Sequence, residues 1–193
     1  TNAMAYVRGN KKDYDEWAAV GNEGWDYASV LPYFKKSENN QNFDDEFHGK
    51  DGPMHVTHAA SPSNVATAFV EACAEQGIQS NPAYNGAEQL GASLLQFTIK
   101  NNQRHSAAAA FLKPVRRRKN LIIVTHTFVK RVLFESGVAV GVEVKNKNAQ
   151  TEIYNCNKEV IISAGTIQSP QILMLSGIGD TNELSKHGII TVK

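Results

Sequence analysis

The sequence has few cysteines, no long apolar segment and almost no net charge. Two cysteines, Cys73 and Cys156, are too few and too far apart for a disulfide framework, which favours a reducing compartment such as the cytoplasm. No stretch approaches the roughly 20 apolar residues that a membrane-spanning helix needs. The formal net charge of +1 gives no global field for nucleic acid or an anionic membrane. With 41% hydrophobic and 20% charged residues, the composition is that of an ordinary globular protein.

A dinucleotide-binding turn and a metal site are also missing. The sequence has no Gly-x-Gly-x-x-Gly motif, which forms the turn that holds a pyrophosphate between a strand and a helix. The nearest partial match, at Gly177 and Gly179, follows a predicted helix and not a strand. The histidines form no helical pair and have no cysteine partners at metal-binding spacing. We therefore expect no metal site among the six histidines, His48, His55, His58, His105, His126 and His187.

Periodicity and turn residues predict a mixed α+β or α/β chain. The clearest helix is expected at 63–76, with Ser63 as its cap, an apolar stripe and Gly77 at its end. Other helices are expected at 13–20, 27–38 and 106–112. Alternating or β-branched runs predict strands at 93–100, 121–127, 130–135, 139–145, 153–156 and 159–163, with Gly137 in a turn. The polar segments 39–52 and 82–91 are expected to be loops.

The segment 158–179, KEVIISAGTIQSPQILMLSGIG, predicts a strand, a tight turn and a helix. Its β-branched run is typical of a strand that is buried on both faces. Ala164 and Gly165 follow at once, and neither has a side chain large enough to keep a flat ligand from the backbone. Thr166 or Ser169 can cap the helix, and Gly177 or Gly179 can end it. These residues alone fit either a cofactor site or an ordinary structural crossover.

The same segment resembles a family signature. AGTIQSPQILMLSGIG is similar to the second signature of the glucose-methanol-choline (GMC) flavin oxidoreductases. Four further blocks precede it in the sequence. The block 1–39 resembles the segment that begins just after the first glycine-serine signature of the family, and the blocks 48–56, 96–114 and 120–144 resemble the family blocks that follow, in the expected order. The resemblance implies an incomplete, Rossmann-like FAD-binding domain with part of a substrate-binding domain. It divides the chain into FAD-domain segments at 1–58 and 115–193 and a substrate-domain segment at 59–114.

The resemblance also implies that this chain is an internal fragment. Family members carry the Gly-x-Gly-x-x-Gly turn before such a segment, and a catalytic histidine, paired with a second histidine or an asparagine, after it. We therefore assign no catalytic residue here and expect the fragment alone to bind FAD poorly and to be inactive. Its partner would be the remainder of its own polypeptide.

The flavin contacts follow from the resemblance residue by residue. The stretch Asn2 to Ala5 looks like the segment that lines the flavin ring, although by itself it would read as a plain strand or turn. Val129 matches a position whose backbone pairs with the adenine edge, and the Ala164–Gly165 pair lies near the ADP half of the cofactor. The resemblance thus implies seven cofactor-binding residues, Asn2, Ala3, Met4, Ala5, Val129, Ala164 and Gly165. On the substrate side it indicates Gln96 and Arg104.

The function implied by the resemblance is oxidation of a primary or secondary alcohol to an aldehyde or ketone, with hydride passing to FAD. Dioxygen or another acceptor would reoxidise the flavin, and the blocks resemble the choline-dehydrogenase-like branch. Two alternatives stay open. One is a flavin-binding relative with lyase-type, non-oxidative chemistry, and the other is a non-enzymatic α+β interaction module.

Two further clusters have simple structural interpretations. Trp17, Trp25 and nearby aromatic residues would pack two short helices together or, alternatively, stack on a substrate. The basic run at 116–119 is expected to be a solvated connector, with a phosphate-binding patch as the alternative.

Overall fold

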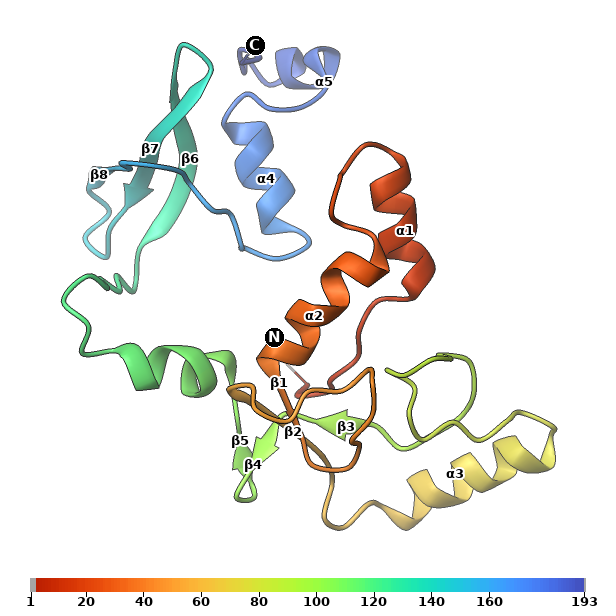
Figure 1. Ribbon diagram of the computed structural model, residues 1–193. Helices are drawn as coiled ribbons and strands as arrows, with labels where there is room; N and C mark the ends of the chain where they lie inside the picture. Colours follow the sequence, from red (N-terminus) through yellow and green to blue (C-terminus); the bar gives the residue numbers. More distant parts are fainter. Residues whose placement is uncertain (1–2, 193) are drawn as a thin grey trace. The chain divides into compact units, whose positions relative to one another are not determined.

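The computed structural model describes residues 3–192 and divides into two compact units, 1–121 and 122–193. We call them unit 1 and unit 2 (Figure 1). Within the described residues, no helix is long and apolar enough to cross a bilayer.

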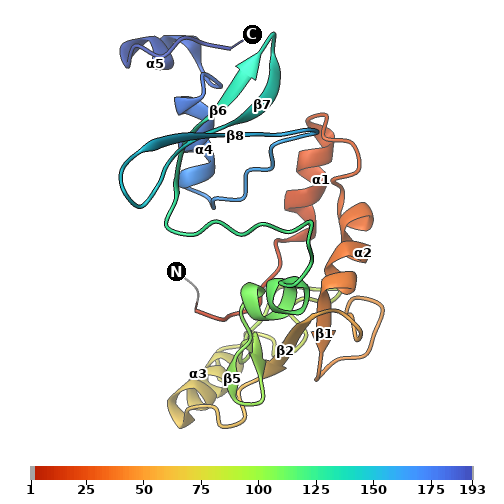
Figure 2. The same cartoon turned by 90° about the vertical axis from the view of Figure 1, so that its left-hand side faces the viewer.

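Unit 1 begins with two helices whose ends are set by local capping. Asn10 and Asp13 form a reciprocal capping box at the start of α1 (Lys11–Ala19), and Asp26 accepts a hydrogen bond of 3.0 Å from the Ser29 N–H at the start of α2 (Tyr27–Ser37). The two helices lie side by side in both views (Figure 2). Aromatic pairs join them: Tyr14 meets Phe34 edge to face at 5.7 Å between ring centroids, and Tyr27 in a tilted pair at 6.2 Å. The packing interpretation of this aromatic cluster thus has direct structural support.

The rest of unit 1 is built from short strands and one long helix. A three-stranded sheet has the order β1 (Glu38–Asn40), β2 (Met54–His58), β3 (Gln96–Phe97), parallel between the first two and antiparallel between the last two. α3 (Asn64–Glu75) follows β2 and begins after Ser63, although the Ser63 side chain makes no capping hydrogen bond. β4 (Ile99–Lys100) and β5 (Gln103–Arg104) form a hairpin. The unit ends with a π-helix, η1 (Ala108–Leu112), and a 3₁₀ turn, η2 (Lys113–Val115).

Unit 2 is an antiparallel meander with two helices. β6 (Phe128–Glu135), β7 (Val138–Lys145) and β8 (Thr151–Asn155) pair in chain order. Ser136 and Gly137 both have positive φ, as a tight hairpin turn requires, so the predicted turn is confirmed. α4 (Gln168–Leu175) is anchored to β6 because the Ser176 hydroxyl accepts the Val132 N–H at 2.8 Å. α5 (Thr181–Lys186) follows and buries Leu184 completely.

Several sequence predictions were wrong in extent or type. The segments 121–127 and 159–163 form no strand in the described chain, and their exposed apolar side chains include Ile122 and Ile161. A strand needs a neighbour to take its N–H and C=O groups, and here neither segment has one. In place of the single predicted strand 93–100, the structure has the two short strands β3 and β4. The first two residues of the predicted loop 39–52 belong to strand β1. The helix predicted at 106–112 is a π-helix over Ala108–Leu112.

Candidate functional site

Met4 and Ala5 of the predicted flavin-lining stretch, and Tyr6 directly after it, lie beside β3. The Met4 carbonyl accepts the Thr98 N–H at 2.8 Å, and the Tyr6 N–H donates to the Gln96 carbonyl at 2.9 Å. Ala5 forms an antiparallel bridge with Phe97 between these two bonds. The stretch therefore acts as an added strand on a sheet edge, which fixes its backbone in place. Asn2, the first residue of the predicted stretch, lies outside the described residues.

Met4 has a left-handed backbone conformation, with φ of +66°. For a residue with a side chain this conformation costs about 1–2 kcal/mol, so the surrounding structure must hold it. Thr98 does so through its N–H, and Ala3 and Ala5 on either side of Met4 are exposed. Strained backbone of this kind gathers at ligand sites. The small exposed alanines leave the backbone open to a flat ligand, which suits the predicted flavin contact.

Tyr84 and Asn85 clamp the chain that leaves this stretch. The Tyr84 hydroxyl accepts the Gln96 N–H at 2.8 Å and donates to the Tyr6 carbonyl at 3.0 Å. The Asn85 side chain donates to the same carbonyl at 3.0 Å and accepts the Arg8 N–H at 2.9 Å. Burial raises the pKa of Tyr84, so the hydroxyl stays protonated and able to donate. Both residues lie in the expected loop 82–91, where the sequence carried no signal of this role.

A buried ion pair anchors the same region from the other side. The Arg8 guanidinium lies 2.5 Å from a Glu38 carboxylate oxygen, and the side chains are 3% and 0% exposed. Glu38 also accepts the Asn40 amide at 2.8 Å and the Gly49 N–H at 3.0 Å. Arg8 further donates to the Phe47 carbonyl at 2.8 Å. The interior of unit 1 is thus largely a hydrogen-bonded polar network.

The two residues predicted on the substrate side lie in different surroundings. The Gln96 side chain is 1% exposed, and its amide exchanges hydrogen bonds with Asn40 and donates to Asn42 at 3.0 Å. In this structure Gln96 therefore works as part of the polar network. Arg104 lies on the exposed strand β5.

In unit 2 the predicted cofactor residues belong to two elements. Val129 is half-buried on β6, opposite Val144 of β7. The turn before α4 is closed by Ser169, whose hydroxyl accepts the Ala164 N–H and whose own N–H donates to the Gly165 carbonyl, both at 3.0 Å. The predicted cap was therefore wrong, because Ser169 bonds backward to the turn. The helix starts after Ile167, and no side-chain hydrogen bond caps it.

Gly165 combines a positive φ of +94° with open space. A Cβ built on it would meet no atom within 4 Å, so the backbone at this turn can be approached closely. The uncapped start of α4 adds N–H groups and the positive end of a helix dipole, which suit an anionic ligand. The room and the donor chemistry at this turn fit the ADP half of FAD.

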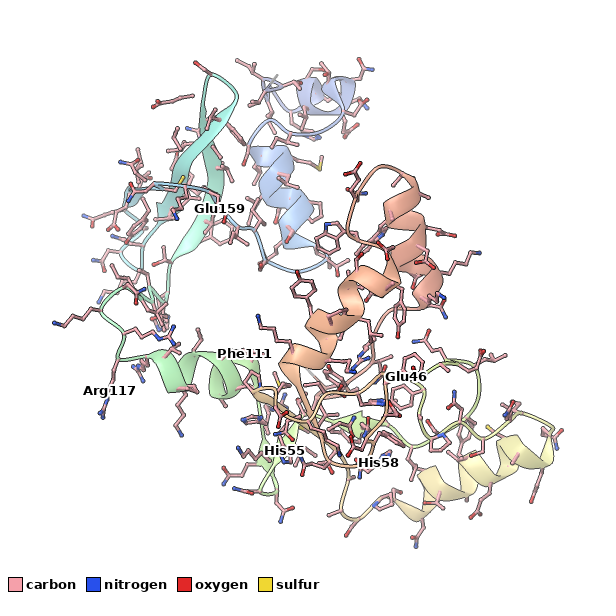
Figure 3. All side chains as sticks on the ribbon, in the orientation of Figure 1. Glu46, His55, His58, Phe111, Arg117 and Glu159 are labelled. Atoms are coloured by element: carbon pink, nitrogen blue, oxygen red, sulfur yellow. The ribbon has the colours of Figure 1, made fainter. Side chains whose placement is uncertain are left out.

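The histidines provide no metal site in the described part of the chain. His55 and His58 lie on β2 (Figure 3). The His55 N–H donates to Nδ1 of His105 at 3.1 Å, so neutral His105 carries its proton on Nε2. Burial, then the Lys100 and His55 charges, lower the pKa of His105. His105 is therefore a neutral side chain with a fixed tautomer.

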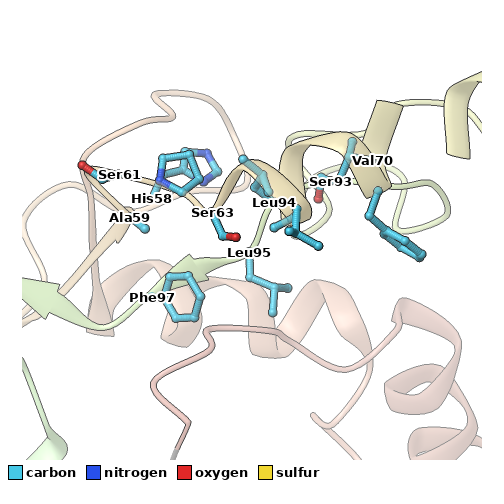
Figure 4. Close-up of a pocket in the computed structure, with 13 residues that line it drawn as sticks. His58, Ala59, Ser61, Ser63, Val70, Ser93, Leu94, Leu95 and Phe97 are labelled. Carbon is cyan, nitrogen blue, oxygen red and sulfur yellow. The ribbon is translucent and has the colours of Figure 1, made fainter. Parts of the chain in front are cut away.

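An apolar cavity of about 660 Å³ lies between α3 and the chain entering β3 (Figure 4). Its walls include Val65 and Phe69 of α3 and Leu94, Leu95 and Phe97 opposite. Of the predicted cofactor and substrate residues that the structure describes, none lines it.

Comparison with known proteins gives consistent matches. Residues 1–189 match the sequence model of a family described as GMC oxidoreductase. The chain is 42% identical over 188 residues to an oxygen-dependent choline dehydrogenase of Rhizobium etli. This match covers 97% of this chain and 34% of the relative. It is similar in structure to pyridoxine 4-oxidase from Mesorbium loti, with a TM-score of 0.87 and 32% identity over 99% of this chain and 38% of that one. An FAD-dependent oxidoreductase from Chaetomium thermophilum has a TM-score of 0.86 and 30% identity, over 98% of this chain and 35% of the other. The chain thus spans about a third of the length of the relatives that it matches.

Proposed function

The chain belongs to the GMC oxidoreductase family, and we propose that it supplies the flavin-contacting scaffold of an FAD-dependent alcohol oxidoreductase. The single observation that carries the proposal is the family match over residues 1–189. The strained, clamped Met4 stretch and the open turn at Gly165 support it, because both offer exposed backbone to a flat ligand. Bound FAD would supply the hydride acceptor.

The proposed contacts divide between the two units. In unit 1, Ala3, Met4 and Ala5, together with Asn2, would lie along the flavin ring, and Thr98 would hold the Met4 carbonyl in its position. In unit 2, Val129 would offer its backbone to the adenine edge, while Ala164 and Gly165 would lie by the ADP half. These residues bind and orient, and we assign no proton transfer to them. The segments 1–58 and 115–193 would form parts of the FAD domain, and 59–114 part of the substrate domain.

For the reaction, we propose oxidation of a primary or secondary alcohol by the full-length enzyme. The relative from Rhizobium etli is named for choline and oxygen, and the Mesorbium loti neighbour for pyridoxine. Both names point to alcohol groups on small molecules, which makes choline-like and pyridoxine-like alcohols the first candidates here. The acceptor would be dioxygen or another oxidant, and the cytoplasm is the proposed compartment.

The test is flavin reduction in the full-length protein without oxygen. The protein should purify with FAD, and choline, pyridoxine or a simple primary alcohol should bleach the visible flavin band. A tertiary alcohol, which has no hydrogen on its carbinol carbon to transfer as hydride, should leave the band unchanged. A bound flavin that none of these alcohols reduces, or a protein that binds no flavin, would contradict the proposal.

A further inference from the structure

The end of unit 1 carries a dense positive charge that the proposed flavin chemistry does not use. Lys113, Arg116, Arg117, Arg118 and Lys119 place five cations in seven positions. They lie in a longer stretch, 89–121, that contains seven Lys and Arg residues and no Asp or Glu. The net charge of +1 for the whole chain therefore hides a strong local asymmetry.

These five cations have no partner in the part of the chain that the structure describes. None of them forms an ion pair or a side-chain hydrogen bond with residues 3–192, whereas Lys130 and Arg131 share the Glu143 carboxylate. All five side chains are exposed, and that of Arg117 projects away from the ribbon (Figure 3). Their charge is therefore available to an anion outside the described chain.

The local backbone turns within this charged run, which directly follows two apolar residues in the sequence. After η2, the Arg118 N–H bonds to the Val115 carbonyl at 2.9 Å, and the Leu121 N–H bonds to the Arg118 carbonyl at 3.1 Å. These two turns prevent the run from extending. Phe111 and Leu112, directly before the first cation, are 40% and 41% exposed. The segment 111–119 therefore combines two exposed apolar side chains and five exposed cations within nine residues.

We propose that the segment 111–119 docks the protein peripherally on an anionic phospholipid bilayer. Five unpaired cations complement any polyanion, but the exposed Phe111 and Leu112 favour a bilayer. At the boundary between headgroups and acyl chains, apolar side chains can be buried while cations stay at the phosphates. A nucleic-acid backbone would use the cations alone. The docking is a surface contact, and it uses none of the residues proposed for FAD.

The charges set the expected size of the effect. Each Lys or Arg close to an anionic bilayer contributes about 1 kcal/mol, which corresponds to roughly a fivefold change in binding. Removing two of the five cations should therefore weaken binding by about 25-fold. The attraction acts over a Debye length, about 8 Å at physiological salt and about 3 Å at 1 M, so binding should fall steeply as salt rises.

The experiment compares vesicles of phosphatidylcholine alone with vesicles that also contain phosphatidylserine, by co-sedimentation of the full-length protein. The variant Arg116→Gln/Arg117→Gln should lose about 25-fold in binding to the anionic vesicles. The control Lys145→Gln/Lys147→Gln removes the same charge from two exposed positions elsewhere and should bind like the parent protein. Unfolding temperature and FAD content, measured for each variant, show that folding is intact. In a third variant, Phe111→Trp, emission should shift to shorter wavelength only with anionic vesicles.

Three results would overturn the proposal. One is equal binding, or no binding, to the two kinds of vesicle. Another is an equal loss in the Lys145→Gln/Lys147→Gln control, which would show a response to net charge alone. The third is binding of an oligonucleotide or an acidic protein by the parent but not by Arg116→Gln/Arg117→Gln, with vesicles left unbound. That result would assign the segment to a different polyanion.

Discussion

Replacing Glu38 by glutamine tests how far the fold of unit 1 depends on one buried ion pair. The substitution keeps the shape of the side chain and removes its charge, so the Arg8 guanidinium, 3% exposed, is left without a carboxylate. Breaking a buried pair by removing one partner costs about 3–5 kcal/mol, because the remaining charge is neither hydrated nor paired. Glutamine can keep one of the hydrogen bonds from Asn40 and Gly49, which places the expected loss near the lower value.

The assay is urea unfolding of the full-length protein, with Glu16→Gln as the control. Glu16 pairs with Lys12 in α1, where the side chains are 64% and 80% exposed, so its loss should cost at most about 1 kcal/mol. The double variant Arg8→Met/Glu38→Gln should recover part of the loss, because it leaves no unpaired charge. If Glu38→Gln costs no more than Glu16→Gln, the buried pair does not hold the fold and the reasoning fails.

Three further predictions concern single side chains. Tyr84→Phe should lower the free energy of unfolding by about 1–3 kcal/mol, because one hydroxyl serves both the Gln96 N–H and the Tyr6 carbonyl; a loss within error would show that water replaces it. Hydrogen bonds from Lys130 and Arg131 lower the pKa of Glu143 from 4.5, so its stabilisation is present above pH 4.5 and is lost as pH falls through the lower folded pKa. The stability gap between the parent and Glu143→Gln should therefore close in acid, and a gap that widens there would contradict the assignment. His105→Gln should keep alcohol-dependent flavin reduction within about tenfold, since losing a general base costs at least about 100-fold, and a larger drop at unchanged FAD content would make His105 catalytic.

Elements set by local sequence were predicted well. The α1, α2 and α3 helices begin and end within a few residues of the predicted bounds, because their apolar stripes and polar caps lie within one or two turns. The β6–β7 hairpin was predicted because Gly137 marks a tight turn between two alternating runs. The family and the cofactor were also predictable, since ordered sequence blocks carry them.

The polar network and the strand pairings could not be predicted from the sequence. Thr98 and Met4 lie 94 positions apart, and Tyr84 and Tyr6 lie 78 apart, so no local pattern reports their contacts. The segments 121–127 and 159–163 have strand composition, but composition does not supply the neighbour that a strand needs. Thr166 or Ser169 was expected to cap the helix, yet serine bonds to any nearby backbone group, and here the Ser169 hydroxyl closes the turn.

The most direct test of the proposed scaffold is the FAD content of Gly165→Val compared with that of Gly21→Val. Both glycines have positive φ, +94° and +101°, and a Cβ at either would meet no atom within 4 Å. The two substitutions therefore impose similar backbone strain without a clash in the described chain. If Gly165 faces the cofactor, the Gly165→Val variant should lose FAD and the Gly21→Val variant should keep it, although the two variants unfold at the same temperature. Equal FAD content in the two variants would contradict the placement of FAD at this turn.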